Sequence, residues 1–145
     1  MTDDEQVEAA EAAAEQDGDN ARGTLLSEIS KEMVRLYKEQ FGRGPTKARA
    51  AWAGPDTLVC TLEDTLTPAE RNLLRLGENE RLRETRMFFQ YASVAEFCEP
   101  VERLTGRKVR AFISGIDAEV DGFAVEMFVL YPAGSTEPSR AQPRD

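Results

Sequence analysis

Histidine is absent from this 145-residue chain, and cysteine occurs only at Cys60 and Cys98. The lack of histidine excludes Ser-His and Cys-His nucleophiles and imidazole metal ligands, and it removes the side chain whose ordinary pKa lies near neutrality. The two cysteines lie far apart in apolar surroundings, which favours buried free thiols over a disulfide or a redox pair. The composition therefore predicts no metal and no cofactor, and it favours a protein that is not an enzyme.

Long apolar runs are missing as well. No segment approaches the ~18 consecutive apolar residues that a membrane-spanning helix needs. The first ten residues, MTDDEQVEAA, are acidic where a signal peptide would be basic and then apolar. We therefore expect a cytoplasmic protein that reaches the periphery of a membrane only through a partner.

Both ends of the chain are poor in residues that could form a core. Residues 1–22 carry eight acidic residues, one basic residue and no aromatic residue, so they cannot bury enough surface to offset the entropy of ordering them. The other end, PAGSTEPSRAQPRD, combines prolines with small polar residues. We expect a disordered acidic leader over residues 1–22, a single α+β domain over residues 23–132, and a disordered tail over residues 133–145.

The first half of the domain has the pattern of one helix and one hairpin. Apolar residues recur every three or four positions from about Thr24 to Phe41, which predicts an amphipathic helix that ends at Gly42. The alternating segments TKARAAW and TLVCTLE flank the turn AGPD and predict two paired strands.

The second half begins with a capping box, in which Thr67 and Glu70 would satisfy each other's backbone N–H groups at the start of a short helix. A longer helical pattern follows from about Asn79. Pro100 interrupts this pattern, so we expect a kink or a fresh helix near Cys98. The segments RKVRAFIS and FAVEMFVLY then predict two more strands.

The two halves resemble each other, since EQFGRGPTKARAAW and ERLTGRKVRAFIS both run from a helix end through glycine and arginine into a basic, alternating strand. A chance likeness of two helix-hairpin units is the alternative. The repeat predicts an α+β fold in which two α-β-β units form a four-stranded, mainly antiparallel sheet, with helices packed on one face. The pattern leaves the strand order open.

Basic residues gather at both helix-to-strand turns. The first turn, GRGPTKA, is not a nucleotide-binding loop, because it lacks the Gly-Lys pair of a Walker A motif and Pro45 has no N–H to donate. If both hairpins join one sheet, the cations form a candidate anion-binding or partner-binding patch made of Arg43, Lys47, Arg49, Arg107, Lys108 and Arg110. The alternative is a solvated sheet edge balanced by Glu63, Asp64 and Glu126.

The last predicted strand, FAVEMFVLY, is apolar on both of its faces. One face should fill the core, and the other would form an exposed apolar strip together with Val59 and Phe112. Such a strip predicts a homodimer that covers it through a twofold interface.

Several of these segments resemble the bacterial MpsC-like family, a domain of unknown function. The resemblance rests on ISKEMVRLYKEQFGRGPTKARAAW, LTPAERNLL, VERLTGRKVRAFIS and AVEMFVLYP, and it spans roughly residues 27–132. The family name implies an accessory role in a sodium-translocating, membrane-potential-generating system. The resemblance supplies no set of catalytic residues.

Three functions follow as hypotheses. The favoured one is a non-catalytic accessory or regulatory module that binds a protein partner, itself included, as part of a membrane ion-translocating complex. The second is a nucleic-acid-binding domain that uses a basic sheet face with Trp52, Phe112 and Phe128 for stacking, although a pI of about 4.7 disfavours it. The third is an enzyme of unrecognised type that uses Lys47 or Cys60.

Overall fold

The computed structural model describes residues 2–142, apart from the side chains of residues 10–19. Its elements follow in the order α1 (Asp3–Phe41), β1 (Lys47–Trp52), β2 (Thr57–Glu63), α2 (Pro68–Arg75), α3 (Asn79–Ala92), α4 (Val94–Thr105), β3 (Val109–Asp117) and β4 (Phe123–Leu130). The predicted α+β class, the two hairpins and the capping box at Thr67 are confirmed. None of the helices in the described part of the chain combines the length and the apolar composition that crossing a bilayer requires.

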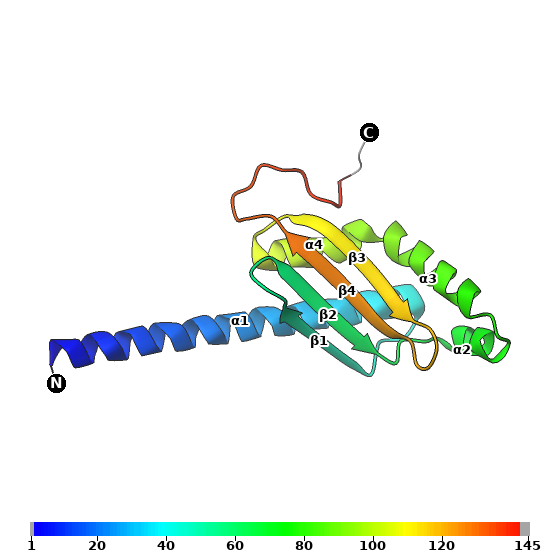
Figure 1. Ribbon diagram of the computed structural model, residues 1–145, viewed down its shortest axis with the longest axis horizontal. Coiled ribbons are helices and arrows are strands. Elements are labelled where there is room, and N and C mark those ends of the chain that lie inside the picture. Colours follow the sequence, from blue (N-terminus) through cyan, green and yellow to red (C-terminus); the bar gives the residue numbers. More distant parts are fainter. Residues whose placement is uncertain (1, 143–145) are drawn as a thin grey trace.

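The four strands form one antiparallel sheet in the order β1-β2-β4-β3. Each hairpin therefore places its first strand at an edge, and the two second strands pair at the centre. Helices α1 and α4 lie side by side behind this sheet in Figure 1 and contact β1 and β3, while α3 contacts β3. The helices thus cover one face of the sheet and leave the other face open.

The hydrophobic core lies between the sheet and the helices. Strand residues alternate in burial, so that Leu58, Cys60 and Leu62 of β2 are buried while their neighbours are half-exposed. Helix α1 contributes Ile29, Met33, Leu36 and Tyr37, and α4 contributes Phe97, Cys98 and Val101. A smaller cluster of Leu66, Leu82 and Ala118 joins α3 to the turn between β3 and β4.

Helix α1 begins at Asp3, so the expected start near Thr24 is wrong and the acidic leader continues the helix. Thr2 caps this helix through a capping box with Glu5. Once the helix is anchored to the domain, alanine and glutamate can extend it without the cost of a new nucleus. Figure 1 shows the extension running past the edge of the sheet. The domain limits themselves stay a prediction.

The helical pattern that follows α2 divides at Ser93 and not near Cys98. Pro100 lies inside α4 and is buried, so its ring adds to the core while the helix continues past it. The segment after β4, which we expected to be loose, contacts the domain: Ser139 is buried and the Arg140 N–H donates to the Val109 carbonyl at 2.8 Å. The last part of the expected tail, residues 143–145, lies outside the described residues.

Candidate interaction surface

Arg43 is tied to its own chain at the turn between α1 and β1. Its Nη1 donates to the Leu66 carbonyl at 2.6 Å, and its Nη2 donates to Asp64 Oδ2 at 3.2 Å. Asp64 also accepts from Arg71, and the hydrogen bond from Arg43 is the main reason that the pKa of Asp64 is lowered. Arg43 therefore joins the end of α1 to the loop that leads into α2.

Arg107 has the same role at the turn between α4 and β3. Its Nε donates to the Tyr131 carbonyl at 2.7 Å, its Nη1 donates to the Pro55 carbonyl at 3.0 Å, and its Nη2 contacts Asp56. Because these partners belong to the β1–β2 turn and the end of β4, Arg107 fixes three segments together. Both arginines thus close helix-to-strand turns at corresponding positions of the two halves.

The six predicted cations do not lie at one place on the sheet. Lys47 and Arg49 point away from the helices on edge strand β1, whereas Lys108 and Arg110 lie at the start of β3, on the opposite edge. The pairing register also places them at opposite ends of the strands. The structure therefore separates the patch into two corners, and a binding role for either corner stays a prediction.

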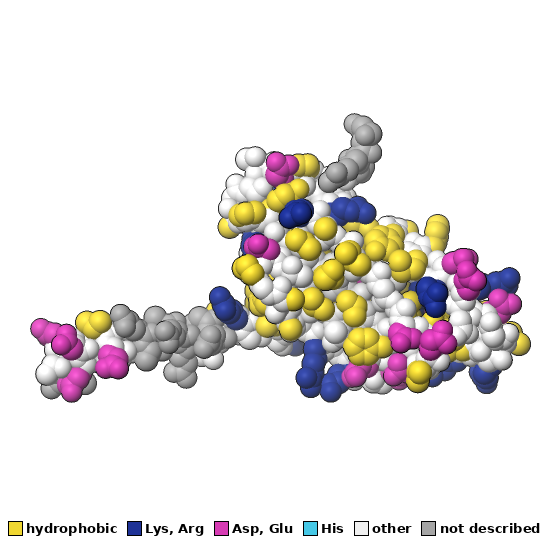
Figure 2. Space-filling model, in the orientation of Figure 1, with side chains coloured by type: hydrophobic (Ala, Val, Ile, Leu, Met, Phe, Trp, Pro, Cys, Tyr) yellow, Lys and Arg dark blue, Asp and Glu magenta, His cyan; other side chains and the backbone are white. Residues whose placement is uncertain are grey.

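The uncovered side of the sheet is apolar across all four strands. Figure 2 shows hydrophobic side chains spread over the strands on this side of the molecule. We call it the open face, and its central residues are Ala51, Val59, Ala111, Ile113, Val125, Met127 and Val129. Ile113 is 51% exposed, although it lies in a regular part of β3. The predicted apolar strip is thus present with Val59, but Phe112 is buried on the helix side, so its placement in the strip was wrong.

The strand register arranges the open face in rows that cross the sheet. One row runs Ala51, Val59, Met127, Ile113 from β1 to β3, and the next runs Arg49, Thr61, Val125, Gly115. A third row, at one end of the sheet, runs Lys47, Glu63, Phe123, Asp117. None of the ion pairs between described residues involves Lys47, Arg49, Glu63 or Asp117. The open face therefore has an apolar centre, a basic β1 edge and an acid on the β3 edge.

The helix-covered face contains a buried polar cluster that sequence reasoning missed. Glu126 was expected among the solvated acids, but its side chain is fully buried. Its Oε1 accepts from the Tyr37 hydroxyl at 2.6 Å and from Gln90 Nε2 at 3.0 Å. Strict alternation along β4 was the signal available, because it groups Glu126 with Ala124, Phe128 and Leu130, and these four residues share the covered face.

Burial raises the pKa of Glu126 to about 7, although the hydrogen bonds from Tyr37 and Gln90 and the charge of Arg86 favour the carboxylate. Burial together with Glu126 raises the pKa of Tyr37 well above its ordinary value. Glu126 Oε2, Ser114 Oγ and Gln90 Oε1 have no hydrogen-bond partner within the described part of the chain. Ser114 faces Glu126 across β3 and β4, so its hydroxyl lies where it also favours the carboxylate.

Arg86 of α3 extends this cluster towards α2. Its guanidinium is 1% exposed, pairs with Glu70, and donates to Thr65 Oγ1 at 3.2 Å. It also lies over the Phe41 ring, with Cζ 4.0 Å from the ring centroid. Burial acts to raise the pKa of Glu70, but hydrogen bonds from Arg86 and Thr67 outweigh it and lower the pKa. Arg86 thus holds the capped start of α2 against α1 and α3.

The two cysteines are buried free thiols, as predicted. Burial raises the pKa of both Cys60 and Cys98 to about 12, so neither forms the thiolate that nucleophilic chemistry needs near neutral pH. Among the residues that the structure describes, no cluster of three or more carboxylates or thiols is arranged to hold a metal ion. Phe112 and Phe128 are buried in the core, so neither offers an exposed ring to a nucleic-acid base.

The part of the chain that matches a known family is nearly the same as the part that forms the sheet and its helices. Residues 21–131, from the second half of α1 to the end of β4, match the family model described as Na+-translocating membrane potential-generating system (MpsC). A curated relative, the uncharacterized protein YbcI of Bacillus subtilis (strain 168), is 26% identical over 111 residues, which cover 76% of this chain and 88% of the relative. No solved structure matches the chain. Since the family model spans both α-β-β units and most of the chain, the protein belongs to the MpsC family.

Proposed function

We propose that this protein is a non-catalytic accessory module that forms a homodimer through the open face and serves a membrane ion-translocating system. The observation that carries the proposal is the apolar centre of the open face, which continues across four strands. At its edges lie charges of opposite sign, Lys47 and Asp117, which form no ion pair with the residues that the structure describes. Sheets with one apolar face are stable in water when that face is covered.

A second copy of the chain fits this face. We place a twofold axis between the two open faces, parallel to the strands and level with the gap between β2 and β4. With this axis, β1 of one copy faces β3 of the other. Lys47, whose neighbour in its own sheet is Glu63, then also faces Asp117 of the partner subunit, so that opposite charges meet across the interface. Aligned sheets pack about 10 Å apart with their strands within roughly 30° of each other, so residues in corresponding rows meet.

Side-chain sizes along the rows suit the same axis. Ala51 would face Ile113 of the partner subunit, and Val59 would face Met127 of the partner subunit, so that small residues oppose large ones. Gly115 leaves room opposite Arg49. Because a twofold axis repeats each of these contacts, one face supplies both halves of an isologous interface.

Two further observations support a module without catalysis. The thiols have pKa values raised to about 12 by burial, and the sequence contains no histidine. The buried Glu126 and Arg86 hold helices against the sheet and do not face the open side. The link to ion translocation comes from the family description, and we propose that a protein partner holds the dimer at the membrane.

Light scattering tests the dimer directly. The wild type should scatter as a dimer of the 16.1 kDa chain at micromolar concentration, and Met127→Lys at the centre of the open face should scatter as a monomer. Val120→Lys is the matched control, because Val120 is 80% exposed in the β3–β4 turn, outside the open face. A monomeric wild type would overturn the proposal.

A charge reversal tests the arrangement of the two copies. Lys47→Glu should weaken the dimer by opposing two acids, and adding Asp117→Lys should restore it by re-forming the pair with reversed signs. Equal dimerisation of the single and double variants would contradict the axis that we propose.

The accessory role has a separate test: loss of the gene should reduce Na+-dependent membrane potential, and Met127→Lys should fail to restore it. An unchanged potential would contradict the role but not the dimer.

A further inference from the structure

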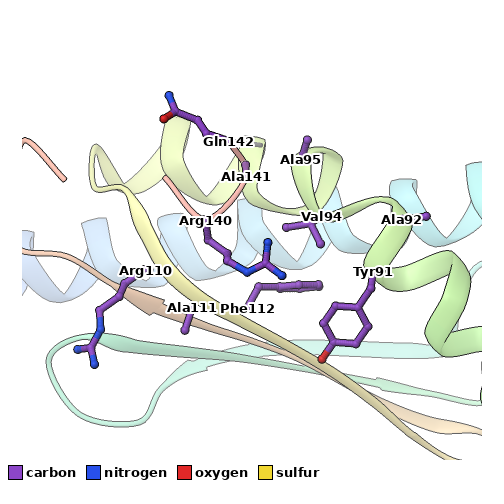
Figure 3. A pocket seen from close by; sticks show the side chains of 10 residues that line it. All are labelled: Tyr91, Ala92, Val94, Ala95, Arg110, Ala111, Phe112, Arg140, Ala141 and Gln142. Atoms are coloured by element: carbon purple, nitrogen blue, oxygen red, sulfur yellow. The ribbon is translucent and has the colours of Figure 1, made fainter. Parts of the chain in front are cut away.

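A cavity of about 730 Å³ lies at the β3 edge of the sheet, and Ala111 is the residue that it shares with the open face. Its walls come from the junction of α3 and α4, the start of β3, and the segment that follows β4 (Figure 3). Tyr91, Val94 and Phe112 supply its apolar surface. The volume is within the range of pockets that hold small organic ligands, roughly 300–1,000 Å³.

The segment after β4 is held in place as a wall of this cavity. The Arg140 N–H donates to the Val109 carbonyl at 2.8 Å, and the Ala141 N–H donates to Ser139 Oγ at 3.0 Å. Ser139 is buried and Ala141 packs against the core. These contacts fix the backbone on both sides of Arg140, so the fold sets the point from which its side chain extends.

Arg140 points into the cavity. Figure 3 shows its guanidinium above the Phe112 ring and beside Val94, while Arg110 at the cavity rim points away. The side chain of Arg140 takes part in no hydrogen bond or ion pair with the residues that the structure describes. The tyrosine hydroxyl nearby is already used, because Tyr91 accepts from the Ser114 N–H at 3.1 Å.

The electrostatics of the cavity favour a negative charge. Among the residues that the structure describes, its lining contains Arg110 and Arg140 and no acidic residue. Helix α4 starts at this wall with Val94, but α3 ends there at Ala92, so the opposite partial charges of the two helix ends offset each other and the arginines supply the positive charge. A guanidinium beside an aromatic ring is suited to an acidic group that is attached to a flat apolar body.

We infer that this cavity binds a small organic anion, with its acidic group paired to Arg140 and its flat apolar part against Tyr91 and Val94. This site goes beyond the proposed dimer, since the central rows of the open face lie outside it. A ligand here would contact α3, α4, β3 and the segment after β4 at once, and it would therefore link the helical layer to the sheet.

The test uses 2-naphthoate as the probe and neutral 2-naphthamide as its matched control. Isothermal titration calorimetry of the full chain should show 2-naphthoate binding that Arg140→Gln weakens about tenfold or more, because a hydrogen bond to a charged group is lost. Arg140→Lys should retain part of the affinity. 2-Naphthamide should bind the wild type and Arg140→Gln equally weakly, since neither complex contains the ion pair.

Two further measurements locate the site. In amide NMR spectra, 2-naphthoate should shift the backbone amide signals of Val94, Phe112 and Ala141. In calorimetry, the control variant Arg75→Gln on α2 should bind 2-naphthoate with the affinity of the wild type. Met127→Lys should bind the probe as the wild type does, which separates this cavity from the open face and from failure of the proposed dimer. Equal 2-naphthoate affinity in the wild type and Arg140→Gln, or no detectable binding at millimolar concentration, would overturn the inference.

Discussion

The helix-covered face of the sheet contains the buried carboxylate of Glu126, whereas the open face presents valine, isoleucine and methionine to the solvent. Strand β4 contributes to both faces. Glu126 points to the helices between Ala124 and Phe128, while Val125 and Met127 point outward. A strand that is apolar on both faces, and whose acid lies on the buried one, departs from the usual half-buried pattern, in which polar residues face the solvent.

The contrast indicates what each face requires. A buried carboxylate is tolerated when hydrogen bonds satisfy it, and Tyr37 and Gln90 provide them from α1 and α3. An apolar open face is tolerated when another surface covers it. The covered face therefore finds its packing and most of its hydrogen bonds within one chain, whereas the open face is completed by the second copy that we propose.

The largest effect should come from the covered side, at Arg86. Arg86→Met leaves Glu70 and the Thr65 carbonyl without their charged donor, and removing one member of a buried pair typically costs about 3–5 kcal/mol of unfolding free energy. Urea unfolding followed by circular dichroism at one fixed protein concentration measures this loss.

The matched control is Arg83→Met on the same helix. Arg83 is half-exposed and lies 3.9 Å from Glu119, and an exposed pair of this kind contributes about 0–1 kcal/mol. Equal losses in the two variants would mean that Arg86 does not hold α2 to the domain as its contacts indicate.

The next effect is the pH dependence that Glu126 confers on stability. Burial raises the pKa of Glu126 from 4.5 to about 7, so the native state binds this proton more tightly than the unfolded state. The stabilising contribution is therefore fully present below pH 4.5, declines as the pH rises, and is lost above pH 7. Over this window the wild type should lose about 3 kcal/mol from this group.

Glu126→Gln removes the titration but keeps the shape of the side chain. Its amide oxygen can accept from Tyr37, and its NH₂ group can donate to Ser114 Oγ. The unfolding free energy of the variant relative to the wild type should therefore increase between pH 5 and pH 8. Other carboxyl groups titrate in both proteins and cancel in the difference. A difference that is the same at both pH values would contradict the raised pKa of Glu126.

Local patterns in the sequence predicted most of the fold. The hairpins, the capping box at Thr67 and the helix end at Gly42 depend on neighbouring residues, and each is confirmed. The strand order and the separation of the basic corners depend on how the two halves pair, which no local pattern contains. The start of α1 at Asp3 was missed because residues 1–22 contain too few apolar residues to form a core and were therefore expected to be disordered. A helix that is anchored at one end can extend without burying its surface.

The candidate sites were harder to predict than the fold. Arg43 and Arg107 were correctly placed at turns, but their carbonyl partners come from segments distant in sequence. Glu126 was assigned to the surface because a charged residue is rarely buried, and only its partners on α1 and α3 explain its position. The cavity at Arg140 was missed because the proline-containing segment around it was expected to be disordered.

The smallest effect should follow a matched change on the two faces. Val125→Thr places a hydroxyl on the open face, where solvent can hydrogen bond to it, so dilute monomeric protein should lose no more than about 0.5 kcal/mol of stability. Val109→Thr makes the same change at a fully buried position, where an unpaired hydroxyl costs about 1–3 kcal/mol. Raising the protein concentration should increase the unfolding midpoint of the wild type more than that of Val125→Thr, because dimerisation stabilises the folded state by mass action. Chemical unfolding at several protein concentrations makes this comparison. If Val125→Thr costs as much as Val109→Thr in dilute protein, the open face is covered by its own chain and not by a second copy.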